Sequence, residues 1–599
     1  MRLRLPIWQC AAALIGALVL TAPADAAQYG QKLDYALQNA RRGGEQRVII
    51  RSRPGRFAEL RQALKACGGL KIQGDHTSID ALTAEVKGEC LQKLIANDVI
   101  DSVGSDAEVT GNYGDYYDVT TIASNTLRST LGSSEYATGA GIGVAVIDSG
   151  IAPLAAFSGR IVGFYDFTNG GVQATSPNDE YGHGTHVAGL IGAYDSDYMG
   201  VAPEVRLVGL KVLDKNGKGR TSHVIRAIEF AIANRARFNL RIVNLSLGHP
   251  ILAPAADDPL VQAVEAAVRA GLIVTVSAGN NGTNPDTGVI GYAGISSPGN
   301  APSAITVGAL DTKGTISRSD DVVTPYSSRG PTWYDGFAKP DVLAPGHALI
   351  SVTDGNSYLY KHYTSLQVKN GRRYYIKLSG TSMATAVTTG VIATVLQASN
   401  WASASTRTAP VHLGGNAMKA LLQYTALPLR QPNGALVDEL TQGTGALNAE
   451  GATRFAWVTT TLAANPWAFG RRSEYLATTS TIGGRTLAWA GRVTWGQTVL
   501  TGEALAMTAA WATNIIWGDN VIWGDNVIWG DNIIWGDNVI WGDNVIWGDN
   551  IVWGENVLWG DNIIWGDNVL WGDNIVWGEN ALLDKISDKV TTLSILGGK

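Results

Sequence analysis

Cysteine is scarce in this chain of 599 residues, and none occurs after residue 90. The three cysteines are Cys10, Cys67 and Cys90. The rest of the chain has no thiol, which excludes a cysteine nucleophile or a thiolate metal site there. A disulfide between Cys67 and Cys90 would suit an oxidising compartment, but the sequence leaves their pairing open.

Excess positive charge and long apolar runs are also lacking. The formal net charge is −6, which argues against nucleic acid as a partner because phosphate binding needs a basic surface. Beyond the N-terminus no run looks apolar and long enough to cross a bilayer, so we predict no membrane span. A chain of this length exceeds what one hydrophobic core supports, so several domains are expected.

Residues 1–26 have the pattern of an export signal. Arg2 and Arg4 give a basic start, residues 7–20 are mostly apolar, and residues 24–26 are small enough for cleavage. We therefore predict a signal peptide and a product that is secreted, either free in the medium or associated with the cell surface.

Residues 27–115 are predicted to form a small α+β domain. The pattern predicts strand, helix, two strands, helix and strand. Five of these six elements are located, at residues 47–51, 56–67, 78–86, 90–96 and 100–103. This βαββαβ order is a common small fold, so by itself it says little about function. Residues after about 112 are polar and weakly patterned, which suits an exposed junction.

Nearly continuous apolar strands follow, at residues 142–147, 205–212, 242–247, 272–277 and 304–307. Strands without alternation are buried on both faces, which predicts a parallel sheet covered by helices. Helical periodicity falls between and after them, at residues 183–193, 222–234, 260–270, 381–397 and 417–425. The fold class expected over residues 116–455 is therefore a doubly wound, mainly parallel α/β domain.

The C-terminal part is repetitive. Residues 456–513 have no clear period and stay unassigned. Over residues 514–580, Asn-(Val/Ile)-(Ile/Val/Leu)-Trp-Gly-(Asp/Glu) recurs every six residues, and eleven of the 19 tryptophans fall on that period. Short paired strands with Gly-Asp turns and a β-solenoid both fit this β-type repeat, and the choice stays open. Residues 581–599 form a C-terminal tail.

The repeats carry an acidic residue in every unit and no basic one. A self-stacking structural tail is one interpretation of this array. Attachment to a cell surface, a polysaccharide or another protein is the other, and cation binding by the acidic column is a weaker third.

Three side chains suited to nucleophilic catalysis lie where strands end or helices begin. Ser382 opens an apolar helix, whose free N–H groups would face a developing oxyanion. A serine hydroxyl needs a base to become a nucleophile, and His183, also at a predicted helix start, can take its proton. Asp148 ends a strand and can accept the imidazole Nδ1–H and stabilise the charged ring.

A metal site is the alternative interpretation of His183 and His186. Zinc peptidases of the His-Glu-x-x-His kind place a glutamate base between their histidines, whereas Gly184 and Thr185 fill that interval here. We therefore predict no metal ligands and interpret His186 as a packed helix residue.

The motifs around these residues resemble those of the subtilisin family of serine peptidases, in which acid, base and nucleophile follow the same chain order. Further matches are residues 200–203 (Gly-Val-Ala-Pro), 246–248 (Ser-Leu-Gly), 277–280 (Ser-Ala-Gly-Asn), 326–331 (Tyr-Ser-Ser-Arg-Gly-Pro) and 339–346 (Lys-Pro-Asp-Val-Leu-Ala-Pro-Gly). They span roughly residues 141–448.

The resemblance implies further roles. Asn280 would donate its side-chain amide to the oxyanion beside the Ser382 N–H. Two segments would wall the pocket for the substrate residue before the cut bond: Ser246, Leu247, Gly248, Ser277, Ala278 and Gly279. Residues 27–115 would be a propeptide that serves as a folding template and as an intramolecular inhibitor.

The resemblance requires no cofactor. The calcium-binding loop usual in the subtilisin family looks short in this sequence. Asp195 and Asp197 could still bind Ca²⁺, but nothing further supports this, and we interpret them as solvated surface carboxylates. Asp214 begins a segment that resembles another calcium loop but lacks the later glutamate, and we interpret it as a turn residue.

The sequence thus predicts a secreted serine endopeptidase, made as a self-processed zymogen, that cleaves protein and peptide substrates through an acyl-enzyme on Ser382. The wall segments contain no acidic residue, so basic side chains are not indicated, and the resemblance implies a preference for apolar or aromatic ones. The alternative is a surface adhesion or scaffold protein that uses the repeats and carries a vestigial protease fold.

Overall fold

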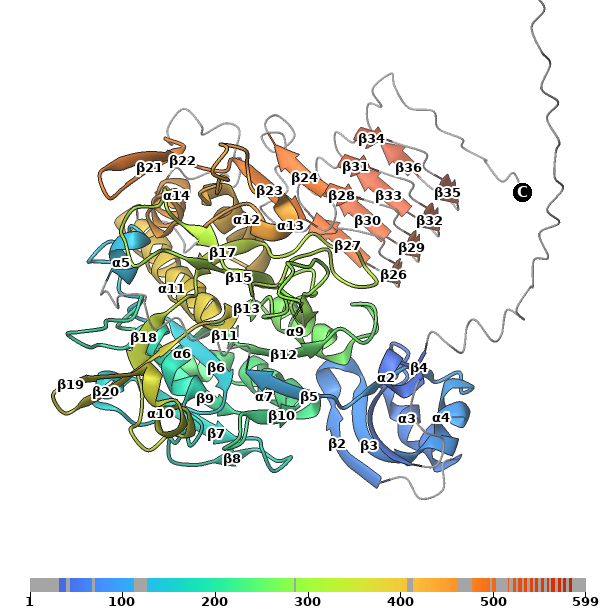
Figure 1. Cartoon of the computed structure of the whole chain (residues 1–599). Helices are drawn as coiled ribbons and strands as arrows, with labels where there is room; N and C mark the ends of the chain where they lie inside the picture. Colours follow the sequence, from blue (N-terminus) through green and yellow to red (C-terminus); the bar gives the residue numbers. More distant parts are fainter. Residues whose placement is uncertain are drawn as a thin grey trace, which may run out of the picture.

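The structure is a computed structural model (Figure 1). It describes residues 32–38, 44–66, 71–111, 126–284, 287–406, 413–461, 477–495 and 498–501, together with short repeat strands between residues 515 and 583. The predicted signal peptide, residues 112–125, Cys67 and the end of the tail lie outside these residues. The rest of the predicted exposed junction, residues 126–136, includes the short helix α5 (Leu127–Thr130) and the buried Leu131, so it is not exposed throughout. Cys90 is disulfide-bonded.

The N-terminal module is a four-stranded antiparallel sheet, in spatial order β2-β3-β1-β4, packed against helices. Its elements follow the order predicted from sequence: β1 (Glu45–Ser52), α3 (Phe57–Ala63), β2 (Lys71–His76), β3 (Ala81–Lys87), α4 (Gly88–Ile95) and β4 (Ile100–Ser105). Val48 and Ile50 pack in the core of this module, whereas Ile49 joins a core of the next domain. Successive side chains of a strand point to opposite faces. One face of β1 therefore packs inside the N-terminal module, and the other packs against the next domain.

The second domain is built on a nine-stranded sheet that is mainly parallel, as predicted. Its parallel strands are, in spatial order, β7 (Ile161–Asp166), β9 (Arg206–Lys211), β6 (Gly143–Asp148), β11 (Leu240–Leu245), β13 (Ile273–Ser277), β15 (Ile305–Asp311) and β17 (Val342–Pro345). The carboxyl ends of parallel strands meet at one edge, which is where open α/β sheets place their binding sites.

Helices cover both faces of this sheet (Figure 1). One face carries α6 (His183–Gly192), α11 (Thr381–Thr406), α12 (Gly415–Thr425) and α14 (Ala449–Thr461), and the other α7 (Thr221–Ala233) and α9 (Pro259–Arg269). Val144 and Val146 face the first set, and Ala145 and Ile147 the second. Burial on both sides explains why the strands read as unbroken apolar runs.

The strand predicted over residues 242–247 is two strands in the structure. β11 ends at Leu245, and β12 (Leu247–Pro250) pairs with other partners outside the central sheet. At the break, the Asn244 side-chain amide donates to Ser246 Oγ (2.9 Å). The apolar run continues through this point, so hydropathy alone did not reveal the break.

Helix α11 contradicts the prediction that no later segment is long and apolar enough to cross a membrane. Its residues 381–405 pass that test by length and hydropathy, but their apolar window is entirely buried inside the structure. The helix is apolar all round because it is a core helix, in contact with α6, α14 and the strands β11, β13 and β15.

A buried charged cluster lies under the sheet edge. Asp341 accepts hydrogen bonds from Lys339 Nζ (2.8 Å) and Lys419 Nζ (3.0 Å), as well as from the Thr306 N–H and the Gln423 side chain. The three charged side chains are at most 3% exposed. Removing one partner of a buried ion pair leaves an uncompensated charge, which is strongly destabilising.

Replacing Asp341 with alanine is therefore expected to lower the free energy of unfolding by about 3–5 kcal/mol. Two ammonium groups would stay buried without their carboxylate. Urea unfolding followed by intrinsic fluorescence measures the effect. Glu450→Ala is the matched control, because Glu450 and its partner Arg454 are both 30% exposed and such pairs contribute about 1 kcal/mol or less. Equal losses in the two variants would contradict the prediction.

The region that the sequence left unassigned adds to this domain. Strands β21 (Thr479–Ile482) and β22 (Arg485–Ala488) form a hairpin, and β23 (Arg492–Trp495) pairs with β24 (Thr498–Thr501). Trp489 is buried between Tyr424 and Phe455, with ring centroids 6.2 and 6.4 Å away. These residues extend the core around α12 and α14.

The repeat strands run from β25 (Ile515–Ile516) to β36 (Ala581–Leu583) and form three parallel sheets (Figure 1). Val521 pairs with Val539, and Asn526 with Asn544, so each strand pairs with the strand three repeats later. The array is therefore a β-solenoid with three repeats in each coil, and not a set of antiparallel hairpins. Identical repeats favour this arrangement, since each coil pairs in register with the next.

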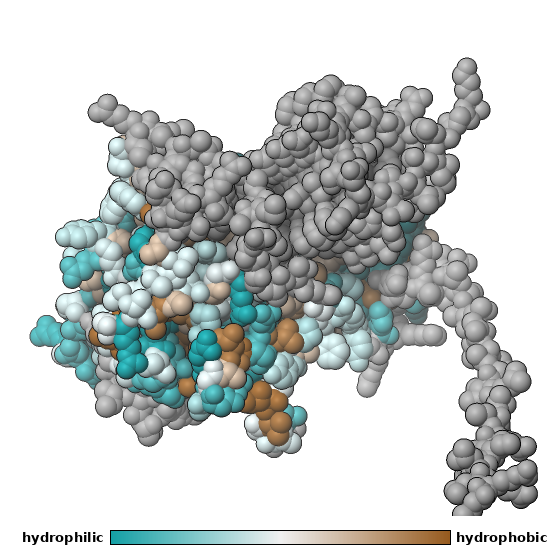
Figure 2. All heavy atoms as spheres, turned by 90° about the horizontal axis from the view of Figure 1, so that it is seen from above, coloured by the Kyte–Doolittle hydropathy of each residue, from teal (hydrophilic) through white to brown (hydrophobic). Residues whose placement is uncertain are grey.

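Exposed apolar side chains of the described residues are spread over the surface. In the view of Figure 2 the coloured surface is mostly hydrophilic or neutral, with apolar residues scattered across it. Single exposed aromatics, such as Tyr136, Tyr194 and Trp333, are ordinary for a folded protein.

Candidate active site

The fold brings two of the three predicted catalytic residues into direct contact. Asp148 is the last residue of β6, and His183 is the first residue of α6. His183 Nδ1 lies 2.7 Å from Asp148 Oδ1, and both side chains are fully buried. With Nδ1–H donated to the carboxylate, Nε2 is the ring nitrogen left to accept a proton.

A second buried carboxylate, which the sequence did not single out, fixes both segments. Asp179 Oδ1 accepts from Ser149 Oγ (2.9 Å) and from the Gly182 N–H (2.8 Å). Its Oδ2 accepts from the N–H and the hydroxyl of Thr185 (2.8 and 2.6 Å). Asp179 therefore ties the turn after Asp148 to the first turn of the His183 helix. Its only sequence signal was an acidic residue shortly before a helix start.

Ser382 lies in the first turn of α11 and is fully buried. Its hydroxyl donates to the Ser246 carbonyl oxygen (2.9 Å), and the Ser246 hydroxyl donates to the Ser382 carbonyl oxygen (3.0 Å). Among the described residues the Ser382 hydroxyl thus donates to Ser246 and not to His183. This pair of bonds places the predicted nucleophile beside a predicted pocket wall.

Asn280 lies next to Ser382, with its side chain oriented by Thr381. Asn280 Oδ1 accepts from the Thr381 N–H (3.0 Å) and from the Thr381 hydroxyl (3.1 Å). Its Nδ2 is buried and has no hydrogen-bond partner within the described part of the chain. A buried amide donor without an acceptor is costly, and a ligand oxygen would satisfy it.

The six predicted wall residues lie in two segments around Ser382 and Asn280. Ser246, Leu247 and Gly248 span the start of β12, and Ser277, Ala278 and Gly279 follow from the end of β13. All six are buried, and Ala278 packs with Ile251 and Ile295 in a small apolar cluster. The Gly279 N–H donates to the Thr381 hydroxyl (3.2 Å), which joins this segment to the Ser382 turn.

A strand from the N-terminal module lies along this wall. β5 (Glu108–Gly111) is the middle strand of an antiparallel ladder between β10 (Lys218–Arg220) and β12 (Figure 1). Gly111 pairs with Leu247, and a Cβ added to Gly111 would lie 3.1 Å from His183 Cε1 and 3.3 Å from Nε2. The end of β5 therefore lies against the imidazole and beside the segment that contacts Ser382.

Two residues weighed as metal ligands have other partners. His186 Nε2 lies 3.1 Å from the Leu349 carbonyl oxygen, and burial lowers the pKa of His186 to about 3. It is a packed helix residue, as predicted. Asp214 Oδ1 accepts from the Asn216 and Lys218 N–H groups (2.8 and 3.0 Å), which makes it a turn residue, as predicted.

Comparison with known proteins identifies the family of this domain. The model of the Subtilase family (Peptidase_S8) matches residues 139–452. Serine protease AprX of Bacillus subtilis (strain 168) is 40% identical over 337 residues, 55% of this chain and 72% of that protein. Subtilisin DY of Bacillus licheniformis is 35% identical over 230 residues, 38% of this chain and 73% of that protein.

Among solved structures, fervidolysin from Fervidobacterium pennivorans, described as a keratinolytic enzyme related to subtilisin, matches with a TM-score of 0.52. It is 21% identical, and the match covers 70% of this chain and 62% of fervidolysin. That likeness supports the fold, and the family match extends over more than half of the chain. The chain belongs to the subtilase family of serine peptidases.

Proposed function

We propose that this chain is a secreted serine endopeptidase in which Ser382 is the nucleophile, His183 the general base and Asp148 the residue that orients and stabilises the imidazole. The hydroxyl of Ser382, which donates to Ser246 in this structure, turns toward Nε2 of His183 to transfer its proton. Its oxygen attacks the peptide carbonyl, and the protonated imidazole then gives the proton to the leaving amine. Water hydrolyses the resulting acyl-enzyme.

The oxyanion of the tetrahedral intermediate is assigned to Asn280 Nδ2 and the Ser382 N–H. The buried, unpaired Nδ2 supports this assignment, because the Oδ1 bonds to Thr381 already hold the amide in place. A donor that is fixed before the reaction costs no reorganisation when the negative charge develops.

Replacing Asn280 with alanine is expected to lower kcat by about 10²–10³-fold with little change in KM. The lost interaction is one made chiefly in the transition state. Steady-state kinetics on a chromogenic peptide amide measure both constants, after wild-type enzyme has removed the N-terminal module. Asn281→Ala is the matched control, since its side chain is directed to the Gly294 carbonyl and Ser296 instead. A loss of less than about fivefold for Asn280→Ala would contradict the assignment.

The single observation that carries the zymogen proposal is the position of β5. A peptide substrate would bind as an extended strand between β10 and β12, and β5 already occupies that place with Gly111 against His183. The N-terminal module therefore acts as an intramolecular inhibitor. The apolar wall around Ala278 supports a preference for apolar or aromatic side chains before the cut bond.

Contacts between the module and α7 support the same role. Asp106 accepts from the N–H and the hydroxyl of Ser222 at the start of α7 (both 2.8 Å). Farther along α7, Glu229 accepts from the N–H and the hydroxyl of Ser78 (3.0 and 2.8 Å). A carboxylate at a helix N-terminus satisfies free N–H groups, so the module also stabilises the helix on which it lies.

The register of β5 also indicates where self-cleavage occurs. Gly111 pairs with Leu247 and lies against the His183 ring. We therefore expect the cut bond to lie within the next two residues, slightly before the boundary at 115 predicted from sequence. N-terminal sequencing of protein recovered from the culture medium tests this expectation, and a mature N-terminus upstream of Gly111 would contradict it. Recovery from the medium also tests secretion, and N-terminal sequencing of the Ser382→Ala variant, which should keep the module, tests removal of residues 1–26.

The adhesion alternative is distinguished by a direct chemical test. A fluorophosphonate probe labels an activated serine, so the mature protein should be labelled at Ser382. A mature, folded protein without label would favour the vestigial fold, with the solenoid as the functional part.

A further inference from the structure

The loop that follows the His183 helix contains two carboxylates close together. Asp195 and Asp197 lie between Ala193 and Gly200, in the loop where the resemblance to subtilisins would place a calcium ion. Asp195 Oδ1 accepts from the backbone N–H groups of Asp197 (2.9 Å) and Tyr198 (3.1 Å). The Asp195 side chain is only 8% exposed, so the prediction of a solvated carboxylate was wrong for Asp195, and its charge needs a partner inside the protein.

That partner comes from a hairpin about 180 residues later in the chain, formed by β19 (Gln367–Asn370) and β20 (Arg373–Leu378). Arg373 Nη1 lies 3.4 Å from a carboxylate oxygen of each aspartate and 2.8 Å from Ser196 Oγ. The Tyr375 hydroxyl lies 3.1 Å from Asp195 Oδ1 and 3.1 Å from Asp197 Oδ2. Asn370 Nδ2 donates to Asp197 Oδ2 (2.9 Å).

These contacts do not fit a calcium ion. Calcium takes six to eight oxygen ligands whose lone pairs face the metal, whereas the oxygens here face N–H and O–H donors. Burial and both carboxylates raise the pKa of Tyr375, so its hydroxyl remains a donor. Within the described residues no group of three or more His, Cys, Asp or Glu side chains could hold a metal. A guanidinium beside the same oxygens would also repel a cation.

We propose that Arg373 is a built-in counter-ion of the Asp195–Asp197 pair and takes the place of a calcium ion in this loop. Arg373 thereby joins two parts of the active site. The loop continues from the helix that begins at His183, and β20 leads through Gly380 to Ser382. Arg373 does not contact the reacting atoms, and the role proposed for it is to stabilise this junction.

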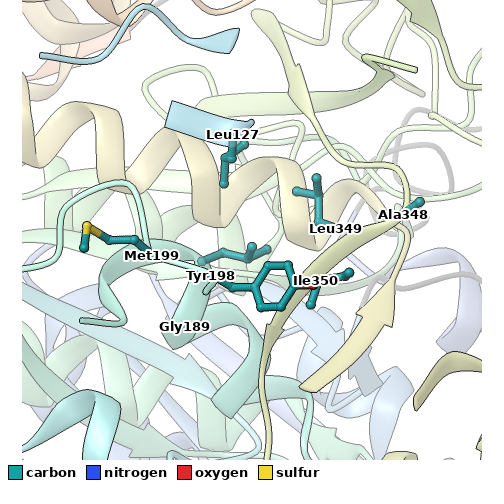
Figure 3. A pocket seen from close by; sticks show the side chains of 8 residues that line it. Leu127, Gly189, Tyr198, Met199, Ala348, Leu349 and Ile350 are labelled. Carbon is teal, nitrogen blue, oxygen red and sulfur yellow. The ribbon is translucent and has the colours of Figure 1, made fainter. Parts of the chain in front are cut away.

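Packing beneath the ionic contacts strengthens the junction. The rings of Tyr198 and Tyr375 meet edge to face with centroids 4.8 Å apart. Tyr198 and Met199 also line a small pocket with Leu127, Leu349 and Ile350 (Figure 3). The loop is thus held by an apolar contact on one side and by Arg373 on the other.

The test uses thermal unfolding of full-length chain carrying Ser382→Ala, so that neither autolysis nor activity enters the readout. In this background we expect the same unfolding midpoint with excess EDTA and with millimolar calcium. Adding Arg373→Ala should lower the midpoint by roughly 2–4 °C in EDTA. Adding calcium should raise the midpoint most of the way back, because without the guanidinium the carboxylates of Asp195 and Asp197 can bind a cation.

Arg372→Ala is the matched control, since Arg372 lies in the same hairpin and the substitution removes the same charge. It should leave the midpoint unchanged in both conditions. Tyr375→Phe removes the hydroxyl and should give an intermediate loss. Equal unfolding midpoints for Arg373→Ala and Arg372→Ala would overturn the proposal. So would a lower midpoint of the parent chain in EDTA than in calcium, if Asp195→Asn removed that difference, because the parent loop would then bind calcium.

Discussion

Replacing Ser382 with alanine is expected to abolish hydrolysis of casein and to leave the N-terminal module attached to the rest of the chain. The substitution removes the nucleophilic oxygen, and in serine peptidases the loss of the nucleophile lowers kcat by about a million-fold. The hydroxyl makes one bond to the Ser246 carbonyl, so the fold should survive its removal. Casein hydrolysis and the intact mass of purified protein measure the two effects.

Ser399→Ala is the control for this substitution. Ser399 is buried in the same helix, α11, and its hydroxyl lies 3.1 Å from that of Thr460, far along the helix from the site. It should yield active, processed enzyme. Processing that continues unchanged in purified Ser382→Ala protein would show that another peptidase removes the module. Residual hydrolysis near the normal rate would show that Ser382 is not the nucleophile.

Replacing Asp148 with asparagine is expected to lower kcat by about 10⁴-fold while the protein stays folded. The asparagine amide cannot accept the Nδ1–H as a carboxylate does, so the imidazole loses the tautomer in which Nε2 accepts the serine proton. It also loses the negative charge that stabilises the imidazolium. Kinetics on a peptide amide, measured after wild-type enzyme has removed the N-terminal module, should show the loss in kcat and little change in KM.

Asp166→Asn provides a close comparison, because Asp166 ends the parallel strand β7 as Asp148 ends β6. Its Oδ1 accepts from the N–H and the hydroxyl of Thr168, a local turn. Near-normal activity is expected for this variant. If Asp148→Asn lost less than tenfold, the carboxylate would not have the role assigned to it.

The sequence predicted the parts of the site that depend on local position. Asp148 ends an apolar strand, and His183 and Ser382 open helices, so each lies where a buried scaffold presents a side chain. The unbroken apolar runs likewise predicted a parallel sheet with helices on both faces. These features follow from residues close together in the chain.

Features that depend on distant pairings were not predicted. Nothing near Asp179 indicated that it would join two catalytic segments, and nothing near Asp195 indicated Arg373 as its partner. The insertion of β5 beside β12 was not predicted either, because the sequence of residues 108–111 indicates only the end of a small domain. The hydropathy pattern predicts which segments are buried, but it does not predict which distant side chain pairs with a buried charge.

The parallel stacking of the repeat strands makes the length of the solenoid adjustable. Every strand pairs with an equivalent strand three repeats away, so adding or deleting one repeat moves the pairing along without changing its chemistry. Neighbouring coils are about 4.8 Å apart, so each repeat extends the rod by about 1.6 Å. Gain or loss of repeats would therefore change the length of the solenoid in small steps, while the peptidase fold stays the same.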